Sequence, residues 1–209
     1  MIRIYYMKLS SDCSSEQSLA LLYGEDKRIL IPGKVEKLYE CLPQERKVLV
    51  DRARNENVRR KRIYTGAFLQ YVLADELGVS MYSLRYCYNQ WGKPELEGHD
   101  LFFNLSHSGE YVVLAISDSP VGIDVEHKTK GYDVLAKRCF CPEEYEDIMS
   151  AGKEEERQHC FLEYWTRKEA YIKCLGEGMR IPLNSFSVQE GNYHTLWLDS
   201  GYCVSVCVG

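Results

Sequence analysis

The segment LFFNLSHSGEYVVLAISDSPVGIDVE, residues 101–126, constrains the fold more than any other part of this sequence. It contains three strand-like runs, at residues 101–105, 111–117 and 121–126, separated only by the short turns at 108–109 and 118–120. Turns this short join antiparallel neighbours, whereas a parallel connection needs a crossover of a dozen or more residues. The segment therefore predicts an antiparallel meander of three strands.

Helical periodicity marks four further segments, at residues 38–49, 63–77, 142–149 and 154–175. The two long helices end at Gly78 and Gly176, because glycine adopts the left-handed conformation that commonly follows a helix. Strand patterns appear at residues 2–9, in NSFSVQE and in GYCVSVCV. The sequence predicts an α+β fold with antiparallel strands and one long helix in each half.

Composition excludes several classes of protein. A net charge of −5 argues against general nucleic-acid binding, and no apolar run reaches the roughly 18 residues of a membrane span. The first residues are too polar for a secretory signal. Nine cysteines are an odd number, and Cys139 and Cys141 lack the spacing of a zinc-binding pair. We therefore expect reduced thiols, a cytoplasmic location and no membrane partner.

Two acids in the run VGIDVEHK need an explanation. Asp124 and Glu126 are two residues apart in a strand, so both point to one face, opposite Val121, Ile123 and Val125. Like charges this close repel each other. One explanation is a strand at a sheet edge with both acids in water, and the other is a cation between them.

The helix at 154–175 offers a third acid. Trp165, Glu169 and Lys173 are spaced by four and share one helix face. Taken alone, Glu169 and Lys173 suggest a surface ion pair that contributes about 0.2–0.5 kcal/mol. Combined with Asp124 and Glu126, Glu169 completes an all-oxygen site, which suits Mg2+, or Mn2+ in its place.

Candidate anion-binding residues occur in three places. Ser106, His107 and Ser108 follow a strand in a small-residue turn, which can present hydroxyl, imidazole and backbone N–H groups to an anion. The basic run at 59–62 and Lys93 in the GKP turn add positive charge. Each feature also has an alternative explanation without a ligand. Serine and glycine commonly form turns, and basic residues are common on a solvated helix surface.

Together the motifs resemble those of the 4'-phosphopantetheinyl transferases. VGIDVE followed by WTRKEAYIK forms the paired signature of that family, and WGKPEL and FNLSHSG resemble the additional motifs of its longer, Sfp-type branch. IPLNSFSV after the long helix is also similar to that branch. The four motifs occur in the family's order between Gly92 and Met179, while the first ninety residues match loosely.

The resemblance implies a fold and a reaction. The fold is a pseudo-dimer of two similar antiparallel-sheet-plus-helix halves in one monomeric chain, with residues 1–100 on the coenzyme A adenylate side and residues 101–209 carrying the metal and catalytic motifs. The reaction moves 4'-phosphopantetheine from coenzyme A to a serine of an apo carrier protein of the acyl, peptidyl or aryl type, and releases 3',5'-ADP.

The resemblance also implies roles for individual residues. Asp124, Glu126 and Glu169 would hold the metal, and Glu169, Lys173 and Asp124 would be catalytic, with Glu169 as a base acting directly or through a water. The expected coenzyme A contacts are Arg62, Gly92, Lys93, Pro94, Ser106, His107, Lys168 and Lys173. Ala67 departs from the family, which often has an acid after the glycine that is Gly66 here.

Two rival functions remain open at this point. A non-catalytic coenzyme A or nucleotide-binding module would keep the pocket without the transfer, and a Mg2+-dependent phosphatase-like enzyme would use the acids differently. The acid triad with Lys173 argues against the first. The absence of a Walker loop and of an aspartate nucleophile motif argues against the second. The carrier and its pathway cannot be read from any local motif.

Overall fold

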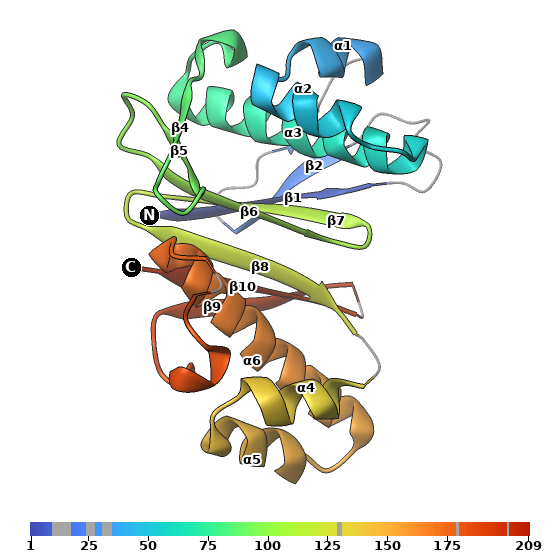
Figure 1. Ribbon diagram of the computed structural model, residues 1–209, viewed down its shortest axis with the longest axis vertical. Coiled ribbons are helices and arrows are strands. Elements are labelled where there is room, and N and C mark those ends of the chain that lie inside the picture. Colours follow the sequence, from blue (N-terminus) through green and yellow to red (C-terminus); the bar gives the residue numbers. More distant parts are fainter. Residues whose placement is uncertain (10–17, 24–27, 31–34, 129–130, 179, 200) are drawn as a thin grey trace.

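The computed structural model describes residues 1–9, 18–23, 28–30, 35–128, 131–178, 180–199 and 201–209. Two antiparallel sheets lie face to face, and each carries helices on its outer side (Figure 1). This arrangement confirms the predicted α+β class. No helix in the described ranges is long and apolar enough to cross a membrane.

The first sheet has five strands in the order β3-β2-β1-β7-β6. Its strands are β1 Ile2–Lys8, β2 Ser18–Tyr23, β3 Arg28–Leu30, β6 Phe102–Ser108 and β7 Tyr111–Ser117. β1 runs antiparallel to β7 along its whole length, from the pair Ile2–Ser117 to the pair Lys8–Tyr111. The N-terminal strand therefore lies at the centre of a sheet completed by strands a hundred residues later.

Helices cover the outer face of this sheet. They are α1 Val35–Glu40, α2 Gln44–Asp51 and α3 Glu56–Leu77, followed by a short 3-10 turn at Met81–Ser83 and the hairpin of β4 Tyr86–Tyr88 and β5 Pro94–Leu96. The predicted helix at 38–49 is two helices instead, because Pro43 cannot continue a helix and takes an extended conformation. α3 starts earlier than predicted, at an N-cap formed by the Asn55 side chain.

The second sheet has three strands in the order β8-β10-β9. Its strands are β8 Val121–His127, β9 Tyr193–Leu198 and β10 Tyr202–Val208. Three helices, α4 Tyr132–Cys139, α5 Pro142–Ser150 and α6 Glu154–Leu175, pack on its outer side (Figure 1). A 3-10 turn at Leu183–Ser185 follows α6. The predicted helix at 154–175 and its stop at Gly176 are confirmed.

The third strand of the predicted meander was placed in the wrong sheet. β8 pairs with β10 and not with β7, so the chain passes from the first sheet to the second at Pro120. The reason is burial on both faces of β8. Ile123 and Val125 pack into the core between the sheets, and on the other face a Cβ at Gly122 would come within 2.0 Å of the Ala170 carbonyl oxygen of α6. β10 supplies the backbone hydrogen bonds of β8 along its whole length, and the packing of its two faces holds β8 in the second sheet.

Other differences concern short elements. NSFSVQE, residues 184–190, was predicted as a strand, but it begins with the last two residues of the 3-10 turn and continues as irregular chain. β9 and α4 were not predicted. The expected division after residue 100 remains a prediction, although strand pairing puts residues 102–117 in the first sheet.

Candidate active site

Asp124 lies at the centre of a polar cluster between β8 and α6. Its side chain is buried, and its Oδ1 accepts hydrogen bonds from Lys173 Nζ at 2.5 Å and from Ser106 Oγ at 2.9 Å. Burial raises the pKa of Asp124, and Lys173 and Ser106 oppose that rise. The other oxygen, Oδ2, is buried without a hydrogen-bond partner. One carboxylate oxygen of Asp124 is therefore hydrogen-bonded, and the other is not.

The other two acids lie within the electrostatic reach of Asp124. Burial and then the charge of Asp124 raise the pKa of Glu126, whose Oε2 accepts a hydrogen bond from Ser108 Oγ at 3.0 Å. Burial and then Asp124 likewise raise the pKa of Glu169 on α6. β8 and α6 thus carry three carboxylates whose negative charges act on one another.

The cluster fits a hard cation in charge and in donor type. The unpartnered Oδ2 of Asp124 and the mutual repulsion of three carboxylates are both relieved by a cation bound to oxygen. In the described part of the chain, however, no three acid, histidine or cysteine side chains stand close enough together to hold a metal ion. Lys173 Nζ is the positive group that touches Asp124. Binding a metal would therefore require side-chain rearrangement around Asp124.

A basic cavity lies at the end of β6, where His107 follows Ser106 of the cluster in sequence. It has a volume of about 610 Å3, and its wall includes Arg46, Lys61, Arg62 and His107. The Arg62 guanidinium donates a hydrogen bond to the carbonyl of Leu49, which also lies in the cavity wall. Burial lowers the pKa of His107, and the positive charge of Lys173 lowers it further. The cavity thus gathers positive charge close to Lys173.

A second cavity adjoins the first through two shared wall residues. It has a volume of about 190 Å3, includes Gly92 and Pro94 of the GKP turn, and shares Arg46 and Leu49 with the basic cavity. Tyr86 and Gln70 contribute further wall. Four of the residues predicted to contact coenzyme A, namely Arg62, Gly92, Pro94 and His107, therefore line two neighbouring hollows.

Lys93 and Lys168 do not join the cluster around Asp124. Lys93 Nζ donates to backbone carbonyls at the end of α6 and at the start of β8, at distances of 2.6 to 3.2 Å. Burial lowers the pKa of Lys93. The prediction that Lys93 contacts the substrate does not fit an ammonium group that is already hydrogen-bonded within the protein.

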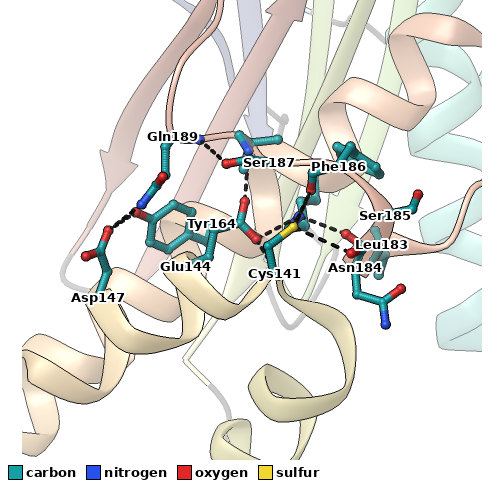
Figure 2. Close-up of polar contacts among 12 residues, drawn as sticks. Cys141, Glu144, Asp147, Tyr164, Leu183, Asn184, Ser185, Phe186, Ser187 and Gln189 are labelled. Carbon is teal, nitrogen blue, oxygen red and sulfur yellow. Dashed lines mark hydrogen bonds and ion pairs between the residues drawn. The ribbon is translucent and has the colours of Figure 1, made fainter.

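Lys168 is held in a different part of the molecule. It is fully buried, forms an ion pair with Glu144 Oε2 at 2.8 Å and donates hydrogen bonds to the carbonyls of Leu183 and Phe186. Figure 2 shows Glu144 and Cys141 facing the segment that carries Leu183 and Phe186. Residues 168 and 169 leave the helix about 100° apart, so Lys168 points away from Glu169 and toward Glu144. Its contact with coenzyme A stays a prediction.

Comparison with known proteins identifies the family. Residues 120–208 match the family model described as the 4'-phosphopantetheinyl transferase superfamily, and they include β8 and α6. The 4'-phosphopantetheinyl transferase Sfp of Bacillus subtilis (strain 168) is 34% identical over 154 residues, which cover 65% of this chain and 68% of that protein. The chain belongs to the 4'-phosphopantetheinyl transferase superfamily.

Further relatives agree with this assignment. The 4'-phosphopantetheinyl transferase gsp of Aneurinibacillus migulanus is 42% identical over 108 residues, covering 52% of this chain and 45% of that protein. The 4'-phosphopantetheinyl transferase HetI of Nostoc is 38% identical over 128 residues, which cover 57% of this chain and 54% of that protein. The chain is an enzyme of the Sfp-type branch that transfers 4'-phosphopantetheinyl groups.

Sequence reasoning missed several groups of this transferase. Arg46 lies in the wall of both cavities, but the register of its segment, LPQERKVLVDR, was too uncertain to include it among the predicted contacts. Glu144 could have been found as the third residue of a helix that starts at Pro142, where an acid commonly bonds back to the N-cap backbone. Its Oε2 does accept the N–H of Cys141 at 3.0 Å. Nothing local indicates its second role as partner of Lys168.

Proposed function

We propose that this transferase moves the 4'-phosphopantetheine group of coenzyme A onto a serine of an apo carrier protein of the acyl, peptidyl or aryl type, and releases 3',5'-ADP. The observation that carries the proposal is the position of Asp124. It contacts Lys173 of α6 on one side and has an unpartnered oxygen on the other, within reach of the charges of Glu126 and Glu169.

Asp124, Glu126 and Glu169 would hold Mg2+, or Mn2+ in its place. Once bound, the cation would supply charge stabilisation for the diphosphate oxygens of coenzyme A. The oxygen-only donor set and the repulsion among the acids support this assignment. Lys173, which forms an ion pair with Asp124, is the ammonium group that would contact an anionic substrate.

The proposed reaction is an attack by the serine oxygen on the β-phosphorus of coenzyme A. A new serine O–P bond forms, the P–O bond to the bridging oxygen breaks, and 3',5'-ADP leaves with the bonding electrons. Lys173 stabilises the negative charge that builds on the phosphate oxygens, while Glu169 accepts the serine proton. The raised pKa of Glu169 supports its role as a base.

The two cavities suit the two ends of the adenylate. The 3'-phosphate is assigned to the basic cavity, beside Arg62 and His107, since charge-assisted hydrogen bonds favour a phosphate there. Ser106 precedes His107 in β6 and is assigned to the diphosphate side, where its hydroxyl meets Asp124. The adenine is assigned to the smaller hollow at Gly92 and Pro94. With the adenylate in these cavities, the diphosphate would extend from them toward Lys173 and the acid cluster.

We further propose that the fold is a pseudo-dimer. Each half would combine an antiparallel sheet with one 22-residue helix, α3 or α6, and the substrate would lie between the halves. Residues 1–100 would form the adenylate side and residues 101–209 the catalytic side. Because both halves belong to one chain, we expect the enzyme to act as a monomer, and we expect a cytoplasmic location because coenzyme A is the substrate.

A single assay tests the function. Purified enzyme, Mg2+ and coenzyme A are incubated with a panel of apo acyl, peptidyl and aryl carrier proteins, and the intact mass of each carrier is measured. We expect at least one carrier to gain one phosphopantetheine, and chelation of the metal to prevent the gain. Unchanged mass across the whole panel contradicts the proposal. Coenzyme A binding without any transfer would favour the non-catalytic binding module.

A further inference from the structure

The turn at residues 89–93 is hydrogen-bonded to the C-terminal end of α6. Asn89 Nδ2 donates to the Gly176 carbonyl at 2.9 Å, and Lys93 Nζ donates to the carbonyls of Lys173 at 2.6 Å and Cys174 at 3.2 Å. The last carbonyls of a helix have no partner within the helix and carry partial negative charge. An ammonium and an amide from a distant segment therefore cap this end.

The same ammonium also reaches the neighbouring strand. Lys93 Nζ donates to the carbonyl of Val121, the first residue of β8, at 3.1 Å. One charged group thus joins the end of α6, where Lys173 is located, to the strand that carries Asp124. A shift at this junction would change the separation of the two side chains.

The turn is preformed for this contact. Asn89 Oδ1 accepts the N–H groups of Trp91 and Lys93, both at 2.9 Å, while Asn89 N donates to the Lys93 carbonyl at 3.0 Å. Gly92 has a φ of 86°, which glycine adopts without strain. The turn therefore presents Asn89 and Lys93 together in one fixed geometry.

The fit between turn and helix end is close. A Cβ added at Gly176 would lie 3.0 Å from Asn89 Nδ2 and 3.0 Å from Lys93 Cδ. Beyond the helix end, the Arg180 guanidinium stacks over the Trp91 ring at 4.1 Å. The contact therefore extends on both sides of Gly176.

We propose that Lys93 and Asn89 are positioning residues of the transferase, which hold the end of α6 against β8 so that Lys173 and Asp124 keep their catalytic separation. A lysine ammonium has three N–H donors, and those of Lys93 meet three backbone carbonyls. None remains for coenzyme A. This inference rests on the proposed function, because it assigns the rate effect to Lys173.

The test compares Lys93→Met with Lys37→Met, which removes an exposed lysine on α1 far from the turn. Steady-state transfer kinetics, the Kd of 3',5'-ADP and amide hydrogen exchange are measured for both variants. A misplacement of about 1 Å can cost roughly 100-fold in rate. We expect Lys93→Met to lower kcat by about 10- to 100-fold, with the KM for coenzyme A and the Kd of 3',5'-ADP nearly unchanged. Lys37→Met should match the wild type.

Hydrogen exchange decides whether positioning is the cause. We expect the amides at residues 172–176 to exchange faster in Lys93→Met, while those of β10 stay protected. Lys93→Arg, which retains charge and donors, should recover part of the rate. Unchanged exchange at 172–176 overturns the proposal whatever the rate does. A raised KM and Kd with unchanged kcat also overturns it, because Lys93 would then be a substrate contact.

A second variant, Asn89→Ala, removes a different contact between the turn and the helix end. If Lys93→Met does not fold, Asn89→Ala removes the contact with Gly176 alone and must give faster exchange at 172–176 and a lower kcat. If the wild type transfers nothing to any carrier, the proposed function fails by itself. In that case the exchange measurement still decides whether the turn holds the helix end.

Discussion

Lys168 and Glu144 form an ion pair of 2.8 Å in which both side chains are fully buried. Glu144 also accepts the backbone N–H of Val188 at 2.8 Å, while Lys168 donates to the carbonyl of Leu183. The pair therefore joins α5, α6 and the segment after α6 at one point. It also directs Lys168 away from the acid cluster, although Lys168 and Glu169 are adjacent in sequence.

The first prediction concerns this pair. Lys168→Met leaves the Glu144 charge buried and without its partner, so we expect a loss of about 3–5 kcal/mol in the free energy of unfolding, measured by chemical denaturation. The double variant Lys168→Met with Glu144→Gln should recover part of that loss, since no isolated charge remains and the amide oxygen can still accept the Val188 N–H. Unchanged stability of the single variant, with a raised KM for coenzyme A, would instead assign Lys168 to the substrate.

The second prediction concerns the metal. We expect Asp124→Asn to abolish Mg2+-dependent transfer while leaving the melting temperature without Mg2+ close to that of the wild type, because the buried Asp124 carboxyl already has a raised pKa. Excess Mg2+ should raise the melting temperature of the wild type and not of the variant. An equal rise in both proteins would remove Asp124 from the proposed metal site.

The third prediction concerns the basic cavity. Arg62→Met removes charge-assisted hydrogen bonds worth about 1.5–3 kcal/mol, so we expect the KM for coenzyme A to rise roughly 10- to 100-fold with little change in kcat. Arg59→Met is the matched control, since Arg59 lies over the Tyr39 ring at 5.3 Å and lines a separate cavity. Similar KM values for the two variants would contradict the assignment.

The fourth prediction concerns pH. Because the pKa of His107 is lowered in the folded protein, the unfolded chain binds more protons between that pKa and about 6.5. Stability should therefore fall as the pH decreases below about 6.5, and His107→Gln should reduce that dependence. Titration by NMR should give a midpoint below 6.5, which Lys173→Met moves upward. A midpoint at 6.5 or above in the wild type would contradict the prediction.

The sequence by itself determined the local features of this transferase. Periodicity and glycine stops predicted α6 and its end at Gly176, and alternation placed Ile123 and Val125 opposite Asp124. The four-residue spacing predicted that Glu169 and Lys173 share a helix face. These features depend on residues within one or two turns of each other, and their geometry follows from the helix and strand repeats.

Only the tertiary structure decided which of these groups meet. Lys173 contacts Asp124 across 49 residues of sequence, and Lys93 reaches the Lys173 carbonyl across 80. Transfer of β8 to the second sheet and the burial of Lys168 against Glu144 likewise depend on partners far along the chain. A lysine has the same local pattern whether it binds a phosphate, a carboxylate or a helix end, because the desolvated partner that decides its role is brought to it by packing.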